Sequence, residues 1–193
     1  TARPFTTHIN AYDLELFLRI APELYLKRCL VGGIDRVFEL NRNFRNEGAD
    51  SSHNPEFTML EFYQAYGDYD QGATITRELI QAAAKAVLGC MTVVHPEYGE
   101  VDLGGEWPQI TLYGAVSQAA GREITVRTPI EVLHEVANKH GVAYDPLWGA
   151  GKITETLFED LVEHTLIQPT FVRDFPVETS PLTRTHRDDE LLV

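Results

Sequence analysis

The stretch that decides the fold is Arg36–Tyr66, RVFELNRNFRNEGADSSHNPEFTMLEFYQAY. Its first part, Arg36–Phe44, mixes β-forming residues with charged ones. The polar segment that follows, which includes Ser52 and Pro55, is typical of a long hairpin loop. Glu56–Tyr66 then predicts a return strand, so the whole stretch indicates strand, loop and strand.

Side chains alternate between the two faces of a strand, so the return strand carries two distinct sets. One face has Phe57, Met59, Glu61, Tyr63 and Ala65, and the other has Thr58, Leu60, Phe62 and Gln64. Because both sets are mostly apolar, we expect both faces to be covered and Glu61 to be largely buried. A buried carboxylate is costly unless it is paired, so a cationic ligand is a candidate partner for Glu61.

The residue types in this stretch indicate which ligands it could bind. Arg45 has a planar, permanently charged guanidinium that suits phosphate oxygens, and Phe57 has a flat ring on which a base could stack. His53 stands in the loop, within reach of a polyphosphate. Glu61 and Tyr63 offer a carboxylate and a hydroxyl to an ammonium group. A nucleotide together with an amine-bearing small molecule would satisfy all of these groups.

The segments FRNEG and HNPEFTMLEFYQAY closely resemble motif 2 of class II aminoacyl-tRNA synthetases, in the form found in lysyl-tRNA synthetases. Motif 2 alone is moderately specific, because the aspartate and asparagine enzymes carry relatives of it. Three further segments resemble the lysine family in the same order: TARPFTTHIN, APELYLKR at Ala21–Arg28, and PTFVRDFPVETSPLTR at Pro169–Arg184. This combination favours lysine.

The resemblance implies a nucleotide-binding role for each matching residue of the loop and its flanking strands. Arg45 matches the arginine that holds the α-phosphate of ATP and the carboxylate side of the amino acid. Glu47 matches the acid near adenine, and Phe57 matches the ring that stacks on adenine. His53 and Asn54 match loop residues near the triphosphate.

For the amino acid, the resemblance implies that Glu23 receives the α-ammonium of L-lysine and that Glu61 and Tyr63 read its ε-ammonium. The implied activity is ATP-dependent activation of L-lysine to lysyl-adenylate and its transfer to tRNA(Lys), with ATP and Mg²⁺ as cofactors. The lysine carboxylate attacks the α-phosphorus in line, and cationic groups neutralise the charge that develops there.

Each of these residues also has an ordinary structural explanation. Arg45 could be a solvated or ion-paired arginine, and Phe57 could simply pack in a core. Glu61 could pair with an internal arginine or lysine. Glu23, near the start of a helix, could complement the helix dipole, and His53 could be an ordinary loop histidine.

Composition and charge narrow the class of protein. The 193 residues are 44% hydrophobic and 23% charged, which is typical of a globular chain with one sizeable core. Cys29 and Cys90 show neither the spacing of metal ligands nor a CxxC motif, so we expect reduced thiols. No apolar run is long enough to span a membrane. Together these features predict a cytoplasmic protein. The net charge of −13 indicates that these residues are not the main tRNA-holding part.

Helix and strand signals elsewhere predict an α+β fold, in which helices flank an antiparallel sheet of the class II synthetase type. Thr128-Pro129-Ile130-Glu131 reads as a capping box with proline at the first helical position. The helices expected are Ala11–Ile20 capped by Asn10, Pro22–Arg28, Asp70–Leu88, Ile110–Ala120, one from Pro129 to about His140, and Ile153–His164; a hairpin is expected at Met91–Leu103 and a strand at Thr170–Glu178.

The resemblance implies that residues 1–193 are a partial class II catalytic domain, with motif 2 at 36–66 and a helical insertion at approximately 70–165. Motif 1, motif 3 and the anticodon-binding OB-fold have no match in these residues. We therefore expect the acidic metal ligands to lie outside this segment and the segment alone to be inactive. The parent protein would be a homodimer.

Two alternatives remain open at this point. The parent could be a bifunctional enzyme that joins a membrane lysyl-transfer module, which makes lysylphosphatidylglycerol, to a lysyl-tRNA synthetase module, in which case it could be membrane-tethered. The chain could also be a synthetase-like paralogue or binding module without tRNA charging, which either attaches lysine to a protein or acts as a regulatory domain.

Overall fold

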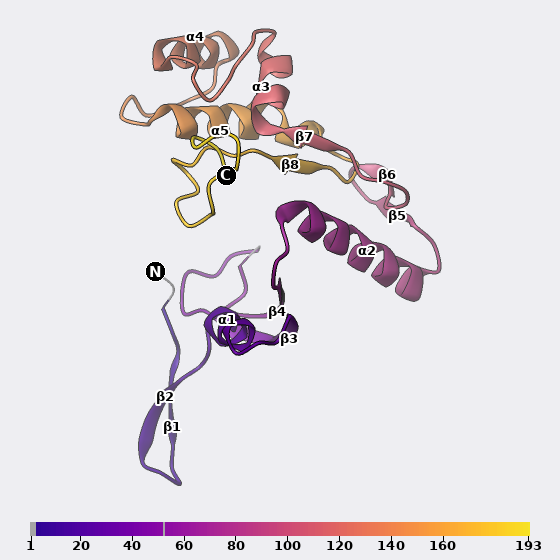
Figure 1. The fold of residues 1–193 in the computed structure, drawn as a ribbon, viewed down its shortest axis with the longest axis vertical. Helices are drawn as coiled ribbons and strands as arrows, with labels where there is room; N and C mark the ends of the chain where they lie inside the picture. Colours follow the sequence, from indigo (N-terminus) through magenta and orange to yellow (C-terminus); the bar gives the residue numbers. More distant parts are fainter. Residues whose placement is uncertain (1–2, 52) are drawn as a thin grey trace. The chain divides into compact units, whose positions relative to one another are not determined.

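A computed structural model of the chain describes residues 3–51 and 53–193; Thr1, Ala2 and Ser52 of the segments quoted above lie outside the described residues. The chain divides into two compact units, Thr1–Gly72 and Ala73–Val193. The described part of the chain contains both helices and small two-stranded sheets, which agrees with an α+β class (Figure 1).

The first unit opens with a hairpin in which β1 (Thr6–Ile9) pairs antiparallel with β2 (Leu14–Phe17). The prediction of a helix over Ala11–Ile20 is therefore wrong. Asp13 turns the chain with φ of 49°, in the left-handed region that a right-handed helix cannot use. The side chain of Asn10 contacts the His8 ring at 3.1 Å between Oδ1 and Nδ1, so it serves the hairpin turn and caps no helix.

Helix α1 (Glu23–Val31) confirms the helix expected after Pro22. Pro22 occupies the N-cap position, where its missing N–H leaves no helical hydrogen bond unmade. Gly32 ends the helix, and Gly33 follows with φ of 95°. The helix packs against both strands of the hairpin that comes next in the chain.

That second hairpin confirms the strand–loop–strand expected over Arg36–Tyr66. Strand β3 (Arg36–Phe44) pairs antiparallel with β4 (Glu56–Gln64), so that Arg36 lies opposite Gln64 and Phe44 opposite Glu56. The return strand ends before Tyr66, which has φ of 59° and begins a turn.

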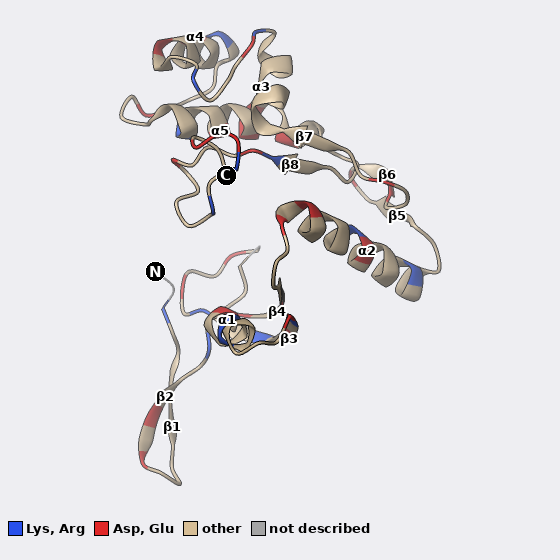
Figure 2. Cartoon of the chain, in the orientation of Figure 1, with Lys and Arg blue, Asp and Glu red and all other residues tan. Residues whose placement is uncertain are grey.

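Helix α2 (Tyr69–Leu88) and the hairpin of β5 (Thr92–His95) and β6 (Gly99–Asp102) agree with expectation. Figure 2 shows acidic residues at the start of α2 and a basic residue at its end, which complements the helix dipole. Gly89 ends the helix with φ of 74°.

Strand β7 (Gln109–Thr111) leads directly into α3 (Leu112–Ala120), so the helix expected from Ile110 starts later than predicted. Ile110 lies opposite Val172 in the parallel pair of β7 and β8 (Phe171–Arg173), a long-range partner that local pattern could not supply. The Oγ1 of Thr111 accepts from the N–H of Gly114 at 3.0 Å and caps α3. The expected strand Thr170–Glu178 is cut short because Asp174 has φ of 61°.

Helix α4 (Ile130–His140) confirms the predicted helix, but the predicted capping box is wrong. Pro129 is the N-cap rather than the first helical residue. The Oγ1 of Thr128 instead accepts from the backbone N–H of Thr125 at 2.8 Å. Gly141 ends α4 in the left-handed conformation, as expected.

Helix α5 (Ala150–Leu161) is followed by the short 3-10 helix Glu163–Thr165, so the predicted Ile153–His164 helix starts earlier and ends in a tighter turn. The N-terminus of α5 is capped by a residue that is distant in the sequence. The Glu178 carboxylate accepts from the N–H of Gly151 at 2.9 Å. A Cβ on Gly149 would stand 2.2 Å from Glu178 Oε1, so only glycine leaves room for this cap.

The buried core cluster of the second unit comes from helices α3, α4 and α5 and the segments between them. Leu112, Leu133, Ile153 and Leu157 are almost completely buried. The complete cluster is Leu112, Tyr113, Val116, Ala120, Ile124, Leu133, Val136, Ala137, Val142, Ile153, Leu157, Phe158 and Val162.

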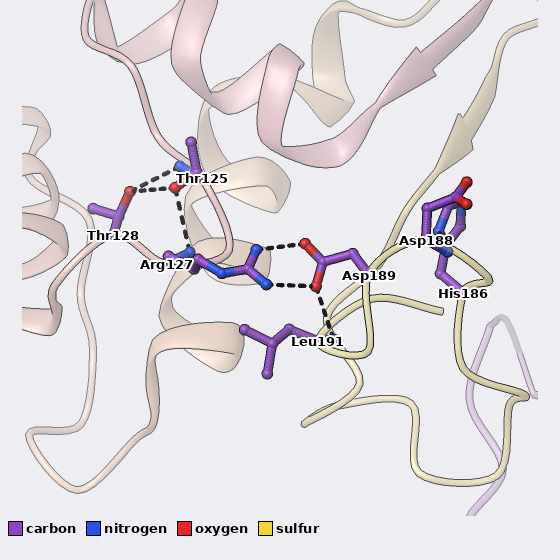
Figure 3. A network of polar contacts seen from close by, with 7 residues as sticks. All are labelled: Thr125, Arg127, Thr128, His186, Asp188, Asp189 and Leu191. Carbon is purple, nitrogen blue, oxygen red and sulfur yellow. Dashed lines mark hydrogen bonds and ion pairs between the residues drawn. The ribbon is translucent and has the colours of Figure 1, made fainter.

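A polar network ties the loop before α4 to the C-terminal segment (Figure 3). Both terminal nitrogens of Arg127 donate to the carboxylate of Asp189, one of them at 3.0 Å. Asp189 Oδ1 also accepts from the N–H of Leu191 at 3.1 Å. The Arg127 guanidinium holds the pKa of the Asp189 carboxyl below its usual range.

Candidate active site

One face of the β3–β4 hairpin carries three of the residues that the sequence singles out. Glu61 and Tyr63 lie on this face with Phe57, and the register places Glu39 opposite Glu61 and Asn43 opposite Phe57. These side chains are half-buried or buried. The other face is exposed: Leu60 and Phe62 keep more than a third of their surface in solvent.

Two expectations about Glu61 are therefore corrected. It is half-buried rather than largely buried, and only one face of its strand is covered within the described residues. Its partner in this structure is Tyr63, whose hydroxyl donates to Glu61 Oε2 at 2.7 Å. Burial and this hydrogen bond raise the pKa of Tyr63 well above its usual range, so the hydroxyl stays a donor at neutral pH.

Helix α1 places Glu23 beside this pair. The negative charge of Glu23 also acts on Tyr63 and contributes to its raised pKa. Glu23 forms an ion pair with Lys27 one turn later, and the Lys27 ammonium lies 5.7 Å from the centroid of the Tyr63 ring. Glu23 is exposed, so a ligand ammonium could reach its carboxylate by displacing Lys27.

Arg45 and Phe57 form the second part of the site. The guanidinium carbon of Arg45 lies 5.1 Å from the centroid of the Phe57 ring, and the Arg45 N–H donates to the Pro55 carbonyl at 2.9 Å. Within residues 3–51 and 53–193, no carboxylate forms an ion pair with Arg45, and its Nε is buried without a hydrogen-bond partner. A half-buried, uncompensated guanidinium fits an anionic ligand such as a phosphate.

The loop residues make fewer contacts with the residues of the site described so far. Glu47, His53 and Asn54 are all exposed. The His53 ring contacts the carboxylate of Asp50 at 2.9 and 3.0 Å, and its backbone N–H donates to the same group at 2.9 Å. The structure thus joins His53 to Asp50 within the loop, and the described contacts link neither Glu47 nor Asn54 to Arg45 or Phe57.

Sequence reasoning missed Arg19 and Glu39. Arg19 forms an ion pair with Glu39, which lies opposite Glu61 on the site face. The antiparallel register could have revealed Glu39, because any hairpin that pairs Phe44 with Glu56 must also pair Glu39 with Glu61. Nothing local in the sequence identifies Arg19 as the partner.

Two searches of the described residues bear on cofactors and membranes. No group of three or more His, Cys, Asp or Glu side chains in residues 3–51 and 53–193 is arranged to hold a metal ion. In the same residues, no helix combines the length and the apolar character needed to cross a bilayer.

Comparison with known proteins identifies the family. A family model described as tRNA synthetases class II (D, K and N) matches residues 1–192. The chain is 60% identical over 98% of its length to a lysine–tRNA ligase of Mycolicibacterium gilvum, and 57% identical over 97% to one of Kineococcus radiotolerans. It spans 38% of the length of each of these two relatives.

A relative of a different kind is also similar. The chain is 54% identical, over 96% of its length, to a lysylphosphatidylglycerol biosynthesis bifunctional protein of Nocardia farcinica, of which it spans 17%. The family match covers nearly every residue, and it agrees with the motif 2 hairpin described above. The chain therefore belongs to the class II tRNA synthetases of the D, K and N group.

Proposed function

We propose that this chain is part of the catalytic domain of an enzyme that activates L-lysine with ATP and transfers it to tRNA(Lys). The observation that carries the proposal is the hydrogen-bonded pair of Glu61 and Tyr63 on one hairpin face, beside Glu23. The identity of 54–60% to lysine–tRNA ligases supports the same amino acid.

The lysine end of the site would be read by charge. The Glu61 carboxylate would accept the ε-ammonium, and the Tyr63 hydroxyl would orient that carboxylate through its 2.7 Å hydrogen bond. Glu23 would receive the α-ammonium. A site with two carboxylates at its two ends favours a ligand that carries two ammonium groups, and it rejects amino acids with a neutral or acidic side chain.

At the ATP end, Arg45 would neutralise charge at the α-phosphate while Phe57 packs against adenine. A lysine carboxylate oxygen bonds to the α-phosphorus, and the bond from that phosphorus to pyrophosphate breaks. The uncompensated guanidinium of Arg45 supports a role at the phosphate. Glu47, His53 and Asn54 would contact adenine and the triphosphate from the loop, in roles that rest on the motif resemblance.

Mg²⁺ bound with ATP would supply positive charge that offsets part of the phosphate charge. Because the described residues contain no acidic cluster of metal-binding geometry, they do not fit as its ligand set.

We assign residues 1–193 to a partial class II catalytic domain, with motif 2 at 36–66 and a helical insertion at approximately 70–165 beside the family's antiparallel sheet. The parent would be a cytoplasmic homodimer.

The test is lysine-dependent exchange between ATP and pyrophosphate in the natural full-length protein that carries this segment. Glu61→Gln leaves a neutral group facing an ammonium and should cost about 1.5–3 kcal/mol, a loss of about 10- to 150-fold in kcat/KM for lysine. Glu15→Gln makes the same chemical change on exposed strand β2 and serves as the matched control. Exchange with lysine by Glu61→Gln at the wild-type rate would refute the assignment.

The Nocardia relative favours a second candidate, in which the activated lysine is finally delivered to a membrane lipid. Both candidates share lysyl-adenylate formation, so exchange does not separate them. The two candidates can be separated by incubating the full-length protein with labelled lysine, ATP, tRNA and phosphatidylglycerol vesicles. Label in tRNA alone supports the first candidate, and label in the lipid supports the second.

A further inference from the structure

Glu61 does not stand alone on its face of the hairpin. The register places Glu39 of β3 directly opposite it. Residues opposite each other on antiparallel strands project to the same side, with their Cβ atoms about 4.5–5.5 Å apart. Two carboxylates in this arrangement repel each other, and a hairpin carrying them needs a positive charge nearby.

Arg19 supplies that charge from outside the hairpin. Its guanidinium forms an ion pair with Glu39 Oε1, and its Nε donates to the carbonyl of Arg42 at 2.9 Å. Asn41 Nδ2 also donates to Glu39 Oε1 at 3.0 Å. These two hydrogen bonds, that of Arg19 first, hold the pKa of the Glu39 carboxyl below its usual range. Glu39 thus accepts two hydrogen bonds at Oε1, one of them from a charged partner, whereas Glu61 accepts from a neutral hydroxyl.

Arg19 also fixes the backbone that leads to Glu23. The carbonyl of Arg19 accepts from the N–H of Phe44 at 2.9 Å, so the chain before α1 is attached to the end of β3. The ion pair adds a second attachment, through the side chain, to the middle of the same strand. Pro22 follows closely and starts α1, whose first residue is Glu23. Arg19 therefore adds attachments between the segment that leads to Glu23 and the strand opposite Glu61, beside the direct packing of α1 on the hairpin.

We propose that Arg19 and Glu39 form a positioning pair for the lysine pocket: Arg19 compensates Glu39, so that Glu61 is the carboxylate left to bind the ligand ammonium, and it anchors the segment that carries Glu23. Neither residue touches the reacting atoms. The inference rests on the proposed function and deepens it, because it assigns part of the selectivity for a basic amino acid to an ion pair beside the pocket.

The test is steady-state exchange kinetics in the natural full-length protein with four variants: Arg19→Gln, Glu39→Gln, the double variant, and Arg19→Lys. Arg19→Gln leaves Glu39 uncompensated opposite Glu61, and Glu39→Gln leaves Arg19 able to compete for Glu61. Each single variant should raise the KM for lysine by about tenfold, while the KM for ATP stays within about twofold.

The double variant removes both charges and leaves Glu61 with a neutral neighbour. It should recover most of the lysine affinity, to within about threefold of wild type, since coupled charges give non-additive effects. Arg19→Lys keeps the charge but loses the bond to Arg42, so its KM should fall between those of wild type and Arg19→Gln. A purely structural role would make the double variant at least as impaired as the worse single variant.

The outcomes separate the two levels of the argument. Recovery in the double variant, with the loss confined to the lysine KM, supports the positioning pair; additive losses, or losses in kcat alone, overturn it while the proposed function stands. Wild-type protein that does not exchange with lysine overturns both. If neither single variant folds, judged by its thermal melting curve, the double variant decides: a lysine KM near wild type supports the pair, and a tenfold rise overturns it.

Discussion

At the scale of single residues, Arg45 is the candidate phosphate-binding group whose surroundings the structure describes most clearly. Its backbone N–H bonds Pro55 across the start of the loop, which fixes where the side chain leaves the strand. Its guanidinium lies over the Phe57 ring, so arginine and aromatic ring hold each other in place. Asn43, on the same face and 1% exposed, has no hydrogen-bond partner for its amide within the described residues. At this end of the hairpin, the Asn43 amide and the Arg45 Nε are therefore buried polar groups without a hydrogen-bond partner, a feature that calls for an explanation such as a bound ligand.

Replacing Arg45 by lysine tests whether the planar guanidinium matters beyond its charge. An ammonium cannot present two parallel donors, so Arg45→Lys in the full-length protein should lower the exchange kcat by about 100-fold or more. Lysine binding, measured by calorimetry, should change much less, because the charge acts mainly at the phosphate. Arg42→Lys, on the exposed side of β3, is the control. A fully active Arg45→Lys protein would count against a bidentate phosphate contact.

At the scale of elements, helix α5 depends on a residue far from it in sequence. Glu178 caps the helix at Gly151, and Gly149 makes room for the carboxylate. This explains why glycine stands at the N-cap position of α5, where a capping side chain is usually found. Similarly, Arg127 and Asp189 connect the loop before α4 to the C-terminal segment, as Figure 3 shows. Both contacts attach the irregular C-terminal residues to the helical unit.

The cap of α5 can be removed from either side. Glu178→Ala deletes the acceptor, and Gly149→Ala pushes it away, so each should lower the free energy of unfolding by about 1 kcal/mol. Because both changes break one contact, the double variant should lose little more than the worse single variant. Urea unfolding followed by circular dichroism measures this. Glu97→Ala, in the exposed turn before β6, is the control, and additive losses would contradict a shared contact.

The Arg127–Asp189 pair predicts a dependence of stability on acid. The contribution of this ion pair to the free energy of unfolding is fully present above the unfolded-state pKa of aspartate, about 3.9. It is lost as the pH falls through the folded-state pKa, which is lower. Asp189→Asn should therefore reduce stability at neutral pH and flatten the fall in melting temperature below about pH 4. Asp188→Asn, one residue earlier and outside the pair, should keep the wild-type slope. An unchanged slope in Asp189→Asn would contradict this linkage.

At the scale of the whole molecule, the core is unevenly divided. The main buried cluster lies in the second unit, whereas in the first unit large apolar side chains stay in solvent. The clearest case is the face of the β3–β4 hairpin that points away from the site. Phe38 is 72% and Leu40 63% exposed, and they pair across the strands with Phe62 and Leu60. Contiguous exposed apolar surface of this kind favours association.

The isolated 193-residue chain should therefore self-associate. Phe38→Lys combined with Leu40→Lys places charges on this face and should shift sedimentation-velocity profiles towards monomer. Leu182→Lys is the matched control, because Leu182 is fully exposed but lies outside the hairpin. A wild-type chain that is monomeric throughout its soluble concentration range would refute the prediction.

Sequence alone determined the elements whose signals are local. The alternation in Glu56–Gln64 fixed which side chains share a face, and proline and glycine marked the ends of α1, α2 and α4. The motif residues predict that Arg45, Phe57, Glu61 and Tyr63 belong to one site. The hairpin brings Arg45 to Phe57 and Glu61 to Tyr63, and the single site stays a prediction. Local chemistry suffices for these features because their partners are close in the chain.

Tertiary structure decided what depends on distant partners. The segment around Asp13 has the composition of a helix, yet β1 pairs with β2 there. Ile110 becomes a strand residue only because β8 lies beside it, and the partner of Glu39 proved to be Arg19. In each case a long-range hydrogen bond or ion pair outweighs a weak local preference, since helix propensities differ by less than about 1 kcal/mol per residue. Sequence therefore supplied the candidate binding groups, and the fold determined which of them have a partner of opposite charge within the described residues.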